Sequence, residues 1–133
     1  MEAKLGKAEK KAFRIANLLD DAADAIRKQS RRAYRAGEIS LEEYMEARAK
    51  ELELRAEVSV VVATDLSGVL EEVAEAGGSI ERAIREATDR IDSASSVRSG
   101  FETITALVGL VGALASGDAK LVLKAGKAFN RDI

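Results

Sequence analysis

The chain has 133 residues, of which 33% are charged and 4% aromatic, and it contains no proline, cysteine or histidine. A chain of this length can bury one core without disulfides or metals, so we expect a single domain over residues 1–133. The composition favours long helices, and the missing histidine and cysteine argue against zinc or haem sites and against Ser/His or Cys/His catalysis.

Charge is strongly segregated although the net charge is only −2. Ten basic and five acidic residues give residues 1–37 a charge of +5, whereas eleven acidic and three basic residues give residues 38–77 a charge of −8. The signs run in mirrored order, which predicts an antiparallel hairpin that places Asp20 near Arg55 and Lys4 near Glu71. Because the second segment then compensates the basic first one, we expect no nucleic-acid partner.

A first helix is predicted over residues 2–36 by apolar or small residues at alternating spacings of three and four, which is the spacing of a coiled coil. Gly37 is a suitable C-terminal stop, and Ser40 with Glu43 forms a capping box for the next helix. The predicted apolar stripe of the first helix consists of Leu5, Ala8, Ala12, Ile15, Leu19, Ala22, Ile26, Gln29 and Ala33.

A second helix is predicted over residues 40–76. Its apolar stripe consists of Leu41, Met45, Ala49, Leu52, Ala56, Val60, Ala63, Leu66, Leu70 and Val73. The β-branched run from Val58 to Ala63 leaves a strand open as an alternative, but helical pattern flanks it on both sides without a turn signal.

Ser79 is the expected N-cap of a third helix over residues 80–115, with a weak point at Ser93–Gly100, where serines and a glycine lower helix propensity. Asp118 is the expected N-cap of a short helix over residues 118–129. The predicted fold is therefore all-α: an elongated antiparallel three-helix bundle of long helices (2–36, 40–76 and 80–115) plus a short C-terminal helix (118–129).

The segment from Thr103 to Gly117 carries no charge over 15 residues, fewer than the ~20 needed to cross a bilayer. Its excess of apolar side chains predicts that the short C-terminal helix, or a second chain, covers it, and Gly109 and Gly112 predict a close helix contact. The candidate interface residues are Phe101, Ile104, Leu107, Val108, Gly109, Val111, Gly112, Leu121, Val122 and Phe129. A membrane-active protein whose segment 101–129 inserts into or lies on a bilayer is the alternative.

Sites for chemistry are weakly indicated. Asp65 lies among apolar residues, but a helix can turn it outward toward Lys10. The acidic groups Asp20, Asp21 and Asp24, or Asp89 and Asp92, lack the ligand spacing of a calcium loop. No phosphate-binding motif or nucleophile with an adjacent base is recognisable, so we expect no enzyme activity, cofactor, metal or catalytic residue.

The sequence therefore predicts a non-enzymatic structural or protein-interaction bundle that self-associates or binds a helical partner through its second to fourth helices. No motif identifies a family. The absent residue types and the capped helices of equal length are also typical of a designed protein, although Ser93–Gly100 and the core glycines are not. No apolar run in Met1–Arg14 resembles a signal peptide, so the expected location is the cytoplasm.

Overall fold

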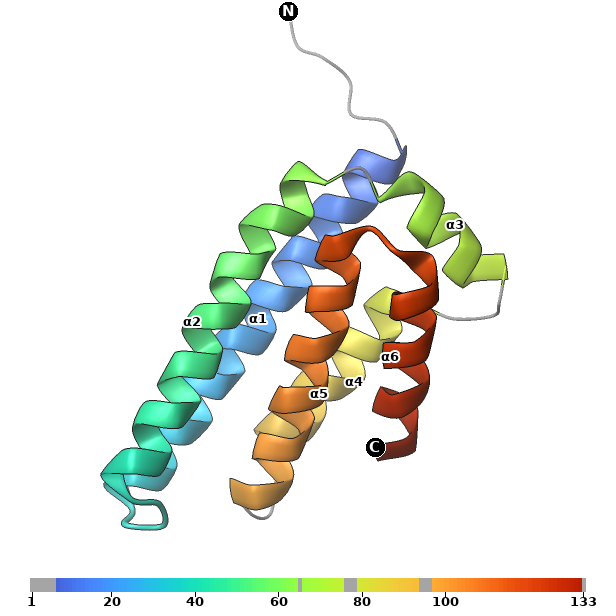
Figure 1. Ribbon diagram of the computed structural model, residues 1–133. Helices are drawn as coiled ribbons and strands as arrows, with labels where there is room; N and C mark the ends of the chain where they lie inside the picture. Colours follow the sequence, from blue (N-terminus) through green and yellow to red (C-terminus); the bar gives the residue numbers. More distant parts are fainter. Residues whose placement is uncertain (1–6, 65, 76–78, 94–96, 133) are drawn as a thin grey trace, which may run out of the picture.

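The computed structural model describes residues 7–64, 66–75, 79–93 and 97–132, whose regular structure is entirely α-helical (Figure 1). The helices in this part of the chain are α1 (Lys7–Arg35), α2 (Leu41–Ala63), α3 (Ser67–Glu75), α4 (Ile80–Asp92), α5 (Val97–Ser116) and α6 (Ala119–Asp132). The all-α prediction is confirmed. The sequence predicts four helices, however, and the described residues form six.

The hairpin between α1 and α2 forms as predicted. Gly37 adopts a positive φ of 74°, and the Glu38 N–H donates to the carbonyl of Ala33 at 2.9 Å, which closes the end of α1. Ser40 Oγ then accepts the Glu43 N–H at 3.1 Å, while Glu43 Oε1 accepts the Ser40 N–H at 3.0 Å. These reciprocal bonds are the predicted capping box.

The second predicted helix is divided into α2 and α3. Helix α2 continues through the valine-rich run to Ala63, so the alternative of a strand there is wrong. It ends at Thr64, whose backbone is extended and whose Oγ1 donates to the Val60 carbonyl at 2.7 Å. Threonine and serine side chains compete for backbone hydrogen bonds in this way, and together with the β-branched run they explain the break. Asp65 lies outside the described residues.

The third predicted helix is divided at its expected weak point. Ser79 Oγ accepts the Arg82 N–H at 3.2 Å and caps α4, as predicted. Ser93 is the C-cap of α4, where its backbone leaves the helical conformation, and its Oγ and N–H both donate to the Asp89 carbonyl. Asp118 caps α6 through its Oδ1, which accepts the Lys120 N–H at 2.9 Å, again as predicted.

The core lies where α1, α2, α4 and α5 meet. Helix α1 packs against both α2 and α4, α5 packs against α2, α4 and α6, and α3 lies against α6 near the N-terminal end of α1 (Figure 1). The predicted apolar stripe of α1 is confirmed from Ala12 to Ala33, apart from the half-buried Gln29. In α4, the side chains of Ile80, Ile84, Ala87 and Ile91 are likewise buried.

Candidate interaction surface

Helix α2 has two apolar faces, only one of which packs against the rest of the chain. The inner face contains Ala47, Leu54 and Val61, each no more than 2% exposed, and it contacts α1 and α5. Helix α2 itself lies at the left edge of the molecule in Figure 1. Successive helical residues are rotated by about 100°, so Leu52 and Leu54 point in nearly opposite directions.

We call the outer apolar face of α2 the outer stripe. Its large members are unusually accessible for a single chain: Leu41 is 55% exposed, Met45 61%, Leu52 52% and Val60 47%. Between them lie small exposed residues, which continue the stripe to the end of the helix. The outer stripe comprises Leu41, Met45, Ala49, Leu52, Ala56, Val60 and Ala63. A contiguous apolar surface of this kind is typical of a protein interaction site.

The structure corrects the predicted orientation of α2. The sequence places the outer stripe in the core, whereas the structure places the opposite face there. The reason is Glu51, which is 1% exposed and interrupts the inner face with a charge. A carboxylate in the middle of a helix face predicts that this face is exposed to solvent. The outer stripe has no such interruption, so the sequence pattern predicts that the outer stripe is the buried face.

Glu51 is tolerated in the core because two guanidinium groups neutralise it. Arg48 Nη1 donates to Glu51 Oε1 and Arg55 Nε donates to Glu51 Oε2, each at 2.9 Å. Arg55 Nη2 also donates to Asp24 Oδ1 on α1 at 2.7 Å. The hydrogen bonds to Asp24 and Glu51 raise the pKa of Arg55, so its positive charge is secure.

A second carboxylate lies between α2 and α5 without such compensation. Among the described residues, Oε2 of Glu57 is buried and has no hydrogen-bond partner. Desolvation, followed by repulsion from Glu53, raises the pKa of Glu57. Its Oε1 lies 3.4 Å from where a Cβ on Gly112 would stand. This is an ordinary van der Waals distance to a side chain, and Gly109 has no atom within 4 Å of such a Cβ, so neither glycine marks a close approach of two helix backbones within the single chain.

The structure distributes the predicted interface residues between core and surface. Ile104, Leu107, Val111 and Val122 are at most 5% exposed within the single chain. Phe101, Val108 and Gly112 are half-buried, whereas Gly109 is exposed and Leu121 is 47% exposed. Phe129 belongs to α6, but its side chain lies outside the described part. A partner would therefore reach the four buried residues only if the bundle opened.

Sequence reasoning missed the outer stripe as a surface, although it identified every residue in it. A signal was present in the pattern itself. Ala47, Leu54, Val58 and Val61 form a second series at helical spacing, and Arg48 and Arg55 flank Glu51 at i−3 and i+4. Two apolar series on opposite faces of one helix indicate either complete burial or an additional partner.

The part of the chain that the structure describes contains neither a membrane-spanning helix nor a cluster of metal ligands. None of its helices is both long and apolar enough to cross a bilayer. No three acidic side chains in that part converge closely enough to hold a metal ion. Comparison of the chain with protein-family models finds no matching family, and comparisons with curated proteins and with solved structures find no significant match.

Proposed function

We propose that this chain is a non-enzymatic helical bundle that self-associates, and that the outer stripe of α2 is the contact between two copies. The observation that carries the proposal is the exposure of Leu41, Met45, Leu52 and Val60 on one face of a single helix. The stripe extends over a helix of 23 residues, which is ~34 Å long at 1.5 Å per residue. A second copy would remove this apolar surface from water.

The spacing of the outer stripe is that of a coiled coil. Met45, Ala49, Leu52 and Ala56 follow one another at intervals of four, three and four, which places them at alternating a and d positions. Leucine and methionine at d alternate with alanine at a. The small alanine side chains permit two helices to approach closely, near the lower end of the usual 8–10 Å range.

Charges beside the outer stripe favour two parallel copies. Glu46 and Glu53 flank one side of the stripe at e positions, and Arg48 and Arg55 flank the other at g positions. A parallel pair brings the g residue of one helix near the e residue of the next heptad on its partner. Arg48 of each copy would then face Glu53 of the other, which gives two such pairs in the dimer. An antiparallel pair would instead bring arginine toward arginine and glutamate toward glutamate.

The expected association is modest in strength. Burying a half-exposed leucine or methionine contributes ~1 kcal/mol, so the large side chains of two stripes supply roughly 6–8 kcal/mol. Association itself costs at least ~4 kcal/mol in lost translational and rotational freedom. We therefore expect a reversible dimer whose population rises with protein concentration.

Sedimentation equilibrium over a dilution series tests the proposal. The unmodified chain is expected to approach twice the mass of one chain as concentration rises, and Leu52→Glu is expected to remain monomeric with unchanged helical circular dichroism. Leu121→Glu is the matched control, because Leu121 is 47% exposed on α6, away from the outer stripe. A monomer at every concentration, or a loss of dimer in Leu121→Glu but not in Leu52→Glu, would overturn the assignment.

A further inference from the structure

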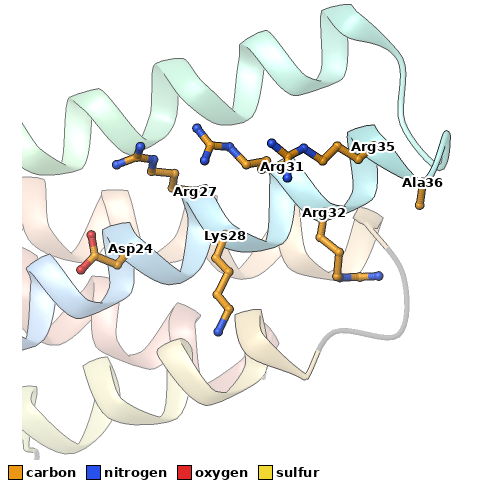
Figure 2. Close-up of a pocket in the computed structure, with 7 residues that line it drawn as sticks. All are labelled: Asp24, Arg27, Lys28, Arg31, Arg32, Arg35 and Ala36. Carbon is orange, nitrogen blue, oxygen red and sulfur yellow. The ribbon is translucent and has the colours of Figure 1, made fainter.

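A row of basic side chains lies along the second half of α1. Arg27, Lys28, Arg31, Arg32 and Arg35, with Asp24 and Ala36, line a shallow groove of about 700 Å³. All five basic residues are exposed. Figure 2 shows Arg27, Arg31 and Arg35 side by side along one edge of the helix, with Lys28 and Arg32 along the other.

In the part of the chain that the structure describes, helix α2 forms no ion pair with this row. Within the described residues, no acidic group lies within 4 Å of Arg27, Lys28, Arg31 or Arg35, and Arg32 reaches only Glu38, at 3.9 Å. Asp24 is already bonded to Arg55. The dipole of α1 accounts for basic residues in its last turn, Arg32 and Arg35, but its effect does not extend back to Arg27 and Lys28.

We propose that this basic row binds the phosphodiester backbone of a nucleic-acid strand. Residues four apart on a helix are separated by ~6 Å along its axis, so Arg27, Arg31 and Arg35 present three guanidinium groups at regular intervals. Guanidinium groups bind phosphate oxygens through paired hydrogen bonds. The row is linear and only one helix wide, which suits a single extended strand.

The same features disfavour a flat anionic membrane as the ligand. A planar surface would meet a whole side of a molecule whose net charge is −2, including Glu38, Glu42 and Glu46 near the hairpin. A single strand contacts the row itself, where, within the described residues, Glu38 at 3.9 Å from Arg32 is the one carboxylate that forms an ion pair with a row residue. Base recognition is not expected, because Tyr34, the one aromatic residue within the basic segment, is already stacked on Tyr44 with ring centroids 4.9 Å apart. Binding is therefore electrostatic and independent of sequence.

Fluorescence anisotropy with a labelled oligothymidine strand, at several salt concentrations, tests the inference. Five phosphate contacts predict a slope of log affinity against log salt of about −3.5 for a single strand. We expect a triple variant to reduce the magnitude of this slope by about 2 and to weaken binding about tenfold at low salt. The variant combines Arg27→Gln, Arg31→Gln and Arg35→Gln. Unlabelled single strand and unlabelled duplex serve as competitors, since both carry the same phosphodiester chemistry. The one that displaces the labelled strand at the lower concentration is the preferred form.

The matched control neutralises three arginines on α4, Arg82, Arg85 and Arg90, all exposed and outside the row. It produces the same change in net charge and should leave the salt slope unchanged. Equal losses in the two triple variants would overturn the inference, as would failure of the unmodified chain to bind either strand or duplex. Sedimentation with phosphatidylserine vesicles but no binding of nucleic acid would also overturn it. Leu52→Glu should bind the strand normally, so the result is independent of self-association.

Discussion

Arg55 on α2 bonds to Asp24 on α1 at 2.7 Å, one helical turn away from the Asp20 that the charge pattern predicts as its neighbour. The antiparallel hairpin and the sign of the pairing are as predicted, and the register differs by four residues. The same guanidinium holds Glu51 at 2.9 Å. One side chain thus joins the two longest helices and neutralises a buried carboxylate.

Arg55→Met is expected to lower the free energy of unfolding by about 2–3 kcal/mol. The variant leaves Glu51 buried with Arg48 as its remaining partner, and breaking a buried ion pair typically costs about 3–5 kcal/mol when no partner remains. Urea denaturation followed by circular dichroism measures the change. Asp24→Asn is the control, with an expected loss of about 0.5 kcal/mol, because Asp24 is 68% exposed.

Adding Glu51→Leu to Arg55→Met should recover most of this loss, since the buried charge is then removed together with its partner. Equal destabilisation by Arg55→Met and Asp24→Asn would show that the contact between α1 and α2, rather than neutralisation of Glu51, is what Arg55 contributes.

Glu57 is expected to make the protein less stable as pH rises. Its folded-state pKa is raised above the usual value of about 4.5, so the folded chain holds the Glu57 proton more tightly than the unfolded chain does. The contribution of Glu57 to the free energy of unfolding is therefore highest below pH 4.5, the usual pKa. It falls as the pH rises from there through the raised pKa of the folded state. Glu57→Gln should therefore be more stable than the unmodified chain at neutral pH, with no advantage below pH 4.5.

The measurement for Glu57 is thermal unfolding of both proteins across this pH range, read as the difference between them so that other carboxylates cancel. Glu72→Gln, at an exposed position on α3, should show no such pH-dependent difference. A constant difference between Glu57→Gln and the unmodified chain at every pH would mean that packing against Gly112, and not the buried charge, decides the effect.

Gly109→Ala is expected to stabilise the protein by about 1 kcal/mol, because alanine is the better helix former and nothing lies within 4 Å of the added Cβ. Gly112→Ala should gain less, since its Cβ would stand 3.4 Å from Glu57 Oε1. Gly37→Ala should destabilise by about 1–2 kcal/mol, because its φ of 74° is unfavourable for residues with a Cβ. Urea denaturation ranks the three, and destabilisation by Gly109→Ala would indicate a close contact there after all.

Local signals in the sequence identified the helix caps, whereas tertiary packing decided the orientation of α2 and the burial of α5. A cap depends only on backbone conformation and on hydrogen bonds to residues a few positions away, so its role follows from sequence alone. This holds for Gly37, Ser40, Ser79 and Asp118. The orientation of α2 does not follow from sequence in this way, because both of its faces are apolar and the choice depends on Arg48 and Arg55 neutralising Glu51 within the fold. The interface prediction on residues 101–129 rested on more apolar surface in this segment than one helix of a three-helix bundle can bury. Helices α2, α4 and α6 pack against α5 within the single chain instead.

The orientation of the proposed dimer can be measured with single cysteines, because the chain contains none of its own. In a parallel pair in register, each residue of the outer stripe meets its counterpart, so Leu52→Cys should oxidise to a covalent dimer under mild conditions. Leu121→Cys, equally exposed but off the stripe, should stay monomeric under the same conditions. In an antiparallel pair Leu52 would lie near Ala49 of the second copy, and a disulfide would form mainly when Leu52→Cys is mixed with Ala49→Cys. Since only the parallel arrangement pairs Arg48 with Glu53, preferential mixed cross-linking would contradict the argument from the flanking charges while leaving the outer stripe as the contact.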